Sequence, residues 1–183
     1  SILCVSVSAK LSAAYDAAKL ASETFALERP ETALRLFDSG AAASSQALIT
    51  LAAARASDKG ASLDEVDAAA KRVAEKVRLV AMLDTLHYIH RSGRVPKIAV
   101  WATNLLNIKP VMEFSTGKIG GIARPRSVPK AIRRIEKEMM NDLEGKIAHI
   151  NVMHAGSPER AGELKTWAAS NLNCAELFVT QFH

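Results

Sequence analysis

Short apolar runs alternate with longer segments of helical pattern along the whole sequence. Residues 1–8 and 34–37 have the length and composition of strands, and residues 9–26 and 41–56, which follow them, have the length of helices. The same order continues to a last apolar run at residues 177–182. Repeated alternation of this kind predicts an α/β fold, with helices covering the faces of its sheets.

A change from polar to apolar composition near Val77 predicts a boundary between two lobes, residues 1–76 and 77–183. Residues 41–56 are almost all small or apolar, so we expect that helix to be buried on most sides. The spacing of Ser62 and Glu65 is that of a capping box, which predicts the start of a charged helix. Polar side chains are also expected to cap the helices that follow them at Asp38, Ser39, Ser127 and Ser157.

The segment from residue 83 to residue 126 has the densest turn signals in the chain. The elements that it predicts are, in order, a helix at residues 85–90, a second helix from Pro96, an apolar run at residues 105–112 and a return strand at residues 119–124. Four residues with glycine at the third position join the last two, which is typical of a β-hairpin. Cations at Arg94, Lys109 and Arg124 flank this apolar segment, a combination that suits an amphiphile with an anionic head, such as a fatty acid.

Composition narrows the class of protein without naming a function. Hydrophobic residues make up 49% of the 183 residues and aromatic residues only 5%, so we expect an aliphatic, alanine-rich core. The net charge of +5 allows an anionic ligand without requiring nucleic acid. Cys4 and Cys174 are far apart and lack metal-type spacing, which indicates a reduced, cytoplasmic protein.

Both ends of the sequence lie inside strand-like apolar runs, and the first residue is Ser1. We therefore expect the chain to be an internal piece of a longer protein. No run approaches about 18 consecutive apolar residues, so no membrane-spanning helix is predicted, and no charged leader indicates a signal peptide.

Four residues are candidates for holding an anionic group. Ser8 and Ser12 lie where a strand passes into a helix, and their hydroxyl and backbone N–H groups can bind a carboxylate or a phosphate. Simple helix capping explains the same serines equally well, and residue type alone favours it. Arg124 and His154 each lie near the end of a predicted strand, where a side chain can face a crevice.

Other motifs favour structural roles. His87 and His90 lack the further ligands that a metal site needs. The cations on the helix that follows Ser127 alternate with apolar residues, as on an ordinary solvated amphipathic helix. The sequence contains no phosphate loop, nucleophile elbow or kinase signature, so we expect neither a self-sufficient catalytic site nor a metal or other cofactor.

The sequence resembles the DegV-like fatty-acid-binding family, whose kinase-associated members are called fatty-acid-kinase B subunits. The most specific part of the resemblance consists of three segments, Asp84–Val95, Leu105–Val111 and Thr116–Lys118. Asp38-Ser39 and the run Val152–Ala155 also match family positions. The resemblance extends, in order, through nearly all of the chain.

This resemblance implies two α/β lobes with one long-chain fatty acid between them, its acyl chain in an apolar tunnel and its carboxylate on hydroxyls and a cation. It implies that the N-terminal lobe is incomplete and that the second lobe lacks its C-terminal end. The expected ligand contacts are Ser8, Ser12, Arg124 and His154. The protein would be a lipid-binding carrier and no enzyme, because a separate ATP-dependent kinase subunit would phosphorylate the carboxylate and the acyl phosphate would enter phospholipid synthesis. Its partners would be the fatty acid, that kinase and, transiently, the membrane, but no nucleic acid.

One departure from the family pattern concerns the expected head-group site. The family often has two adjacent serines where this chain has Ser8-Ala9, so Ser8, Ser12 or a backbone N–H would have to replace the second hydroxyl. Two alternatives also remain open. The protein could be an enzyme that acts on a small phosphorylated or carboxylated metabolite with Arg124, Lys109 and His154, or a basic regulatory or nucleic-acid-binding module.

Overall fold

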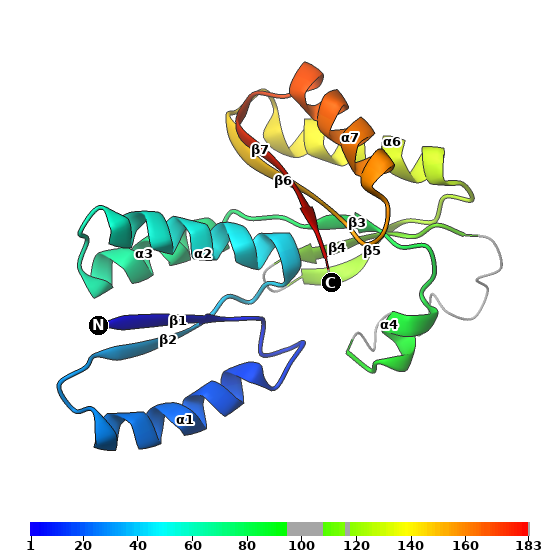
Figure 1. Ribbon diagram of the computed structural model, residues 1–183. Helices are drawn as coiled ribbons and strands as arrows, with labels where there is room; N and C mark the ends of the chain where they lie inside the picture. The colour runs from blue at the N-terminus through cyan, green and yellow to red at the C-terminus, as the bar shows by residue number, and fades with distance from the viewer. Residues whose placement is uncertain (95–107, 116–117, 183) are drawn as a thin grey trace. The chain divides into compact units, whose positions relative to one another are not determined.

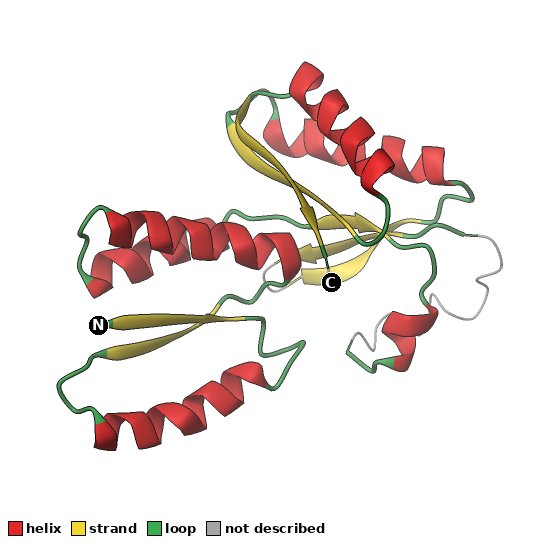
Figure 2. Cartoon of the chain, in the orientation of Figure 1, coloured by secondary structure: helices red, strands yellow, loops and turns green. Residues whose placement is uncertain are grey.

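The computed structural model describes residues 1–94, 108–115 and 118–182 (Figure 1). Helices and strands alternate along the chain, which confirms the predicted α/β class (Figure 2). The chain divides into two compact units. The first comprises Ser1–Leu79, Ile89–Pro96 and Phe114–Ile119, and the second comprises Val80–Tyr88, Lys97–Glu113 and Gly120–His183. The predicted boundary at Val77 concerns the lobes of a longer protein and stays a prediction.

The first unit is built on a parallel pair of strands, β1 (Ile2–Ser6) and β2 (Leu34–Asp38). Their register runs from Ile2 opposite Leu34 to Ser6 opposite Asp38. Parallel neighbours need a long crossover connection, and α1 (Ala14–Glu28) supplies it. In Figure 1, α1 lies on one side of the strand pair, and α2 (Ala43–Asp58) and α3 (Leu63–Ala74) lie on the other.

The core of the first unit lies where α2 and α3 meet the strands. Its buried members are small and aliphatic, and they pack against Leu3, Val5 and Phe37 of the strands: Ala41, Ile49, Ala53, Val66, Ala70 and Ala74. The expectation that α2 is buried on most sides is wrong, because its buried residues are Ser44, Ser45, Ile49 and Ala53, which form one stripe. Its composition is apolar all round, but within this unit its neighbours cover one side.

Local capping signals were right in one case and wrong in others. The predicted capping box exists, since the Ser62 N–H donates to Glu65 Oε2 over 2.8 Å and the Glu65 N–H donates to Ser62 Oγ over 3.4 Å. The bonds from Ser62 lower the pKa of Glu65 because they favour its charged form. By contrast, α2 begins after Ala42 with no side-chain cap, and neither Ser127 nor Ser157 makes a capping bond.

A three-stranded sheet has the order β3 (Val80–Met82), β4 (Val111–Ser115) and β5 (Lys118–Ala123). The first two are antiparallel. Adjacent β4 and β5 fit the predicted hairpin, whose turn at residues 116–117 lies outside the described residues. The predicted helix from Pro96 and residues 105–107 of the predicted apolar run lie outside them too, whereas residues 108–112 of that run are described and lead into β4. The predicted helix at residues 85–90 is α4 (His87–Arg91).

The second unit also contains a parallel pair, β6 (Ala148–His154) and β7 (Cys174–Gln181), joined by α7 (Pro158–Asn171). The helix α6 (Val128–Leu143) precedes this pair. Buried Ala131 and Ile135 pack α6 against Val111 of β4, while Met139 and Leu143 of α6 reach the cluster formed by β6 and α7. Among the described helices, none has both the length and the apolar composition that a membrane crossing needs.

An ion pair joins the end of β3 to the residue before Pro110. Lys109 Nζ donates to Asp84 Oδ1 over 2.8 Å and to the Asp84 carbonyl over 3.3 Å. Two backbone bonds support this connection, Leu83 N–H to Pro110 O over 2.9 Å and Lys109 N–H to Pro125 O over 2.7 Å. The hydrogen bond from Lys109 lowers the pKa of Asp84, because it favours the charged carboxylate more strongly than partial burial disfavours it.

We expect Asp84→Asn in the full-length protein to lower the free energy of unfolding at neutral pH by less than about 1 kcal/mol, since Asp84 is exposed and Lys109 is only partly buried. The pKa of Asp84 is lower in the folded state than its ordinary value of 3.8, so the contribution of the pair is present above that value and disappears as the pH falls through the folded value. Urea denaturation of both proteins should therefore show a difference that shrinks as the pH falls below 3.8.

Glu163→Gln is the matched control, because Glu163 is an exposed acid on α7. A difference between wild type and Asp84→Asn that stayed constant from neutral to acid pH would contradict the role given to this pair.

Candidate functional site

The carboxyl ends of β1 and β2 place two polar turns side by side. Parallel strands end at the same edge of a sheet, where α/β proteins commonly bind ligands. The turn after β1 contains Ser8 and Ser12, and the turn after β2 contains Ser39 and Ala41. Two backbone bonds join the turns, Ser39 N–H to Ser6 O over 3.2 Å and Ser8 N–H to Ala41 O over 2.8 Å. The two turns therefore form one structural feature.

Asp38 bonds to both turns with a single oxygen. Its Oδ1 accepts the N–H of Ala9 over 3.2 Å and the N–H of Gly40 over 2.9 Å. Gly40 has a φ of +59°, a left-handed conformation that glycine adopts without steric cost. The sequence predicted that Asp38 caps the next helix, and this was wrong. The side chain instead holds the two turns together.

Ser8 and Ser12 shape the first turn through their backbone and side chains. The N–H groups of Leu11 and Ser12 both donate to Ser8 O, over 2.9 Å and 3.1 Å. The Oγ atoms of Ser8 and Ser12 accept the N–H groups of Lys10 and Ala14, and side-chain bonds of this kind compete with a regular helix. The helix α1 accordingly begins at Ala14 instead of residue 9. The predicted start of that helix was therefore wrong, and residues 9–13 belong to the turn.

Both hydroxyls keep a proton that can bind an anion. Ser8 is only 2% exposed, and its Oγ accepts the N–H of Lys10 over 3.3 Å. Ser12 Oγ accepts the N–H of Ala14 over 3.2 Å. Within the described part of the chain neither O–H group donates a hydrogen bond. A serine hydroxyl can accept and donate at once, so each can still donate to a ligand oxygen.

Arg94 brings a guanidinium group to the same turn. Its Nε donates to Leu11 O over 3.1 Å, although the two residues are 83 positions apart. Gly93, with a φ of +67°, precedes it and follows α4. No acidic side chain among the described residues pairs with Arg94, so its remaining N–H groups are available to an anion. The sequence identified Arg94 as a flanking cation, but no local signal could place it beside Leu11.

The other two predicted site residues lie in the second unit. Arg124 follows β5, is exposed, and interacts with another part of the protein. His154 is the last residue of β6 and is half-buried. Its Nδ1 accepts the N–H of Ser157 over 3.4 Å, and its carbonyl accepts the N–H of Phe182 over 2.8 Å. The structure thus brings Ser8 and Ser12 together in one turn, while contacts of any of the four with a ligand stay predictions.

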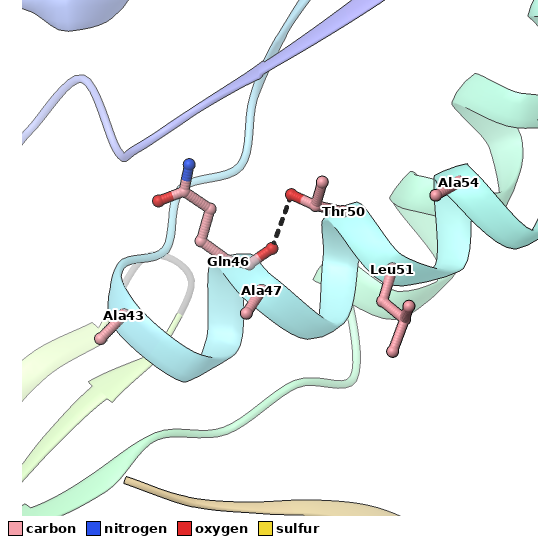
Figure 3. Close-up of a pocket in the computed structure, with 6 residues that line it drawn as sticks. All are labelled: Ala43, Gln46, Ala47, Thr50, Leu51 and Ala54. Carbon is pink, nitrogen blue, oxygen red and sulfur yellow. Dashed lines mark hydrogen bonds between the residues drawn. The ribbon is translucent and has the colours of Figure 1, made fainter. Parts of the chain in front are cut away.

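An open apolar face of α2 begins beside the Ser8 turn (Figure 3). Its lining residues all come from this one helix, so it is a surface and not an enclosed tunnel: Ala43, Gln46, Ala47, Thr50, Leu51 and Ala54. The hydroxyl of Thr50 donates to Gln46 O over 2.9 Å. The Gln46 amide donates to Val5 O over 3.4 Å. Both bonds occupy polar groups that would otherwise oppose an apolar ligand here.

Within the described ranges, no three His, Cys, Asp or Glu side chains lie close enough together to bind a metal ion. Lys109, one of the cations expected to face an anionic ligand, is paired with Asp84. The arrangement in the first unit can therefore bind a small anionic group, through two hydroxyls and one guanidinium, next to an apolar surface.

A family model described as "Uncharacterised protein, DegV family" matches residues 1–182. A DegV domain-containing protein of Streptomyces coelicolor is 32% identical over 163 residues, which are 89% of this chain and 56% of that protein. One of Streptococcus pyogenes is 31% identical over 153 residues, 83% of this chain and 52% of that protein. The chain therefore spans just over half the length of these two relatives.

Solved structures share the fold of this chain. A structure described as fatty acid binding of a DegV family protein from Thermus thermophilus has a TM-score of 0.85 and 27% identity, over 98% of this chain and 63% of that one. The fatty acid kinase (Fak) B3 protein of Streptococcus pneumoniae, loaded with linoleic acid, has a TM-score of 0.87 and 22% identity, over 98% and 64%. With the family model matching nearly every residue, the chain belongs to the DegV family.

Proposed function

We propose that this protein binds a long-chain fatty acid and holds its carboxylate at Ser8, Ser12 and Arg94. One observation carries the proposal: the bond from Arg94 Nε to Leu11 O brings a guanidinium to the turn that contains both hydroxyls. Arg124 and His154, expected contacts from the sequence, are proposed as further ligand contacts of the second unit.

The chemistry of this turn suits a carboxylate. A guanidinium binds carboxylate oxygens through paired N–H groups, and charge-assisted bonds of this kind are stronger than neutral ones. The carboxylate of Asp38 also lies at this turn, and its Oδ1 accepts the N–H groups of Ala9 and Gly40. Ala9 has no hydroxyl group, so we assign the carboxylate contact that a second serine would make to Ser12 and Arg94.

The acyl chain is proposed to lie against the apolar face of α2. That face starts two residues after Ala41, whose carbonyl accepts the N–H of Ser8. Burying one methylene contributes about 0.8 kcal/mol, so about a dozen outweigh a head-group bond of roughly 1.5–3 kcal/mol. The tail therefore provides most of the affinity, and the head group sets the orientation. That the ligand occupies a tunnel between two lobes stays a prediction.

The fatty acids named in the descriptions of similar proteins support this proposal. The Thermus thermophilus protein is described by its fatty acid binding, and a DegV protein of Eubacterium eligens, with a TM-score of 0.86 and 22% identity over 98% of this chain and 65% of that one, was loaded with heptadecanoic acid. The fatty acid kinase (Fak) B3 protein of Streptococcus pneumoniae was loaded with linoleic acid.

The second part of the proposal concerns a partner. We propose that the protein presents the carboxylate to a separate ATP-dependent kinase in the cytoplasm, with the fatty acid as its only small-molecule ligand. The protein itself would be a carrier. The rival hypothesis of an enzyme for small anionic metabolites used Lys109 as a free cation, and Lys109 is paired with Asp84.

Arg94→Gln tests the head-group site. In the full-length protein, freed of lipid, we expect oleate to bind about 10- to 100-fold more weakly than to wild type, because a charge-assisted bond of roughly 1.5–3 kcal/mol is lost. Isothermal titration calorimetry measures the affinity. Arg91→Gln, an exposed arginine on α4, is the matched control and should bind like wild type. Equal affinity of the Arg94→Gln variant and wild type would refute the site, and absence of any oleate binding by wild type would refute the function.

Ala47→Glu tests the apolar face. A carboxylate in the path of the acyl chain should weaken oleate binding by more than about tenfold, because an unpaired charge is costly to desolvate. The same change at exposed Ala21 on α1, Ala21→Glu, should leave the affinity unchanged. Equal losses in the two variants would show that α2 plays no special part.

Reconstitution tests the carrier role. The full-length protein with oleate and ATP alone should form no acyl phosphate, whereas addition of the fatty-acid kinase from the same cell should form it, detected as the hydroxamate after trapping with hydroxylamine. Turnover by the protein alone would identify an enzyme instead. Failure of the complete mixture, with oleate binding intact, would remove the kinase from the proposal and leave the lipid binding.

A further inference from the structure

Three cations line the outer side of α6. Lys130, Arg133 and Lys137 are all exposed, while Ala131 and Ile135 of the same helix are 0% and 7% exposed. At about 100° per residue, the three side chains lie within an arc of about 60°, on the side that faces away from the two buried residues. We call these three residues the α6 cationic stripe.

The charges of the α6 cationic stripe are not neutralised within the described part of the chain. No acidic side chain there forms an ion pair with Lys130, Arg133 or Lys137. The neighbouring Arg134 differs, since it pairs with Glu138 over 2.8 Å. Like charges three and four residues apart on a helix repel one another. An anionic partner would remove that repulsion, which is why this surface is a candidate for docking.

The chemistry of the stripe favours a lipid surface over a protein. The centre of a protein–protein interface is depleted of charge and rich in aromatic and other apolar anchors, and the α6 cationic stripe has cations at its centre. A row of lysine and arginine on a helix is, in contrast, what an anionic bilayer surface attracts. Met140, three residues after Lys137, is 54% exposed and extends the same face with an apolar side chain.

We propose that the α6 cationic stripe docks this protein onto bilayers that contain anionic phospholipid. The biological reason rests on the proposed function, because a carrier of long-chain fatty acids must exchange them with a membrane. The physical attraction does not depend on it, since the three charges are present with or without a ligand. Each cation near such a surface strengthens binding by about fivefold.

The test measures partition of the full-length protein onto vesicles of phosphatidylcholine, with and without phosphatidylglycerol, by co-sedimentation. Wild type should bind only the vesicles with phosphatidylglycerol, and added salt should weaken the binding. The variant Lys130→Gln/Arg133→Gln/Lys137→Gln should bind them about a hundredfold more weakly. The matched control, Lys19→Gln/Arg72→Gln/Lys165→Gln, removes the same charge from exposed positions on α1, α3 and α7 and should bind like wild type.

Thermal denaturation and oleate affinity are measured for every variant, and both should match wild type because the altered side chains are exposed. Equal vesicle binding by the stripe variant and wild type would overturn the proposal, as would an equal loss in the control. Vesicle binding that persists while kinase-dependent acyl phosphate formation falls would overturn it in favour of an acidic protein surface. Vesicle binding by a wild type that binds no oleate would support the docking surface while refuting the proposed function.

Discussion

Parallel pairing of β1 with β2 is the constraint on which the candidate site depends. Because the strands run in the same direction, the chain must leave both of them at one edge, and the two turns become neighbours there. Asp38 uses that proximity, with one carboxylate oxygen bonded to a backbone N–H from each turn. A hairpin of the same strands would separate these groups by the length of the sheet. The site is therefore a consequence of topology before it is a matter of residue type.

The sequence correctly predicted those features of the fold that interactions between neighbouring residues determine. The capping box of Ser62 and Glu65, the approximate strands and the alternation of elements were all read correctly, because neighbours in sequence determine them. The start of α1 was misplaced, since the side chains of Ser8 and Ser12 bond to nearby backbone N–H groups and so compete with helix formation. Burial of α2 was overestimated because composition does not tell which sides of a helix its neighbours cover.

The candidate site was predictable only in part, and distance along the chain explains why. Ser8 and Ser12 could be recognised from their place between a strand and a helix, whereas Arg94 meets their turn from 83 residues away. Lys109 shows the opposite error. As an isolated cation it looked available to a ligand, and its bond with Asp84, 25 residues distant, could not be read from either neighbourhood. The role of a charged side chain can be assigned only when its ion-pair partner is known.

The open face of α2 has a consequence for selectivity. Thr50 and Gln46 direct their hydrogen bonds inward, so what remains exposed is dominated by alanine methyl groups and one leucine. A surface of this kind offers no chemical group that could distinguish one saturated hydrocarbon chain from another. If the alkyl tail lies there, the protein discriminates among ligands by geometry alone, through how far the tail extends and where a double bond bends it.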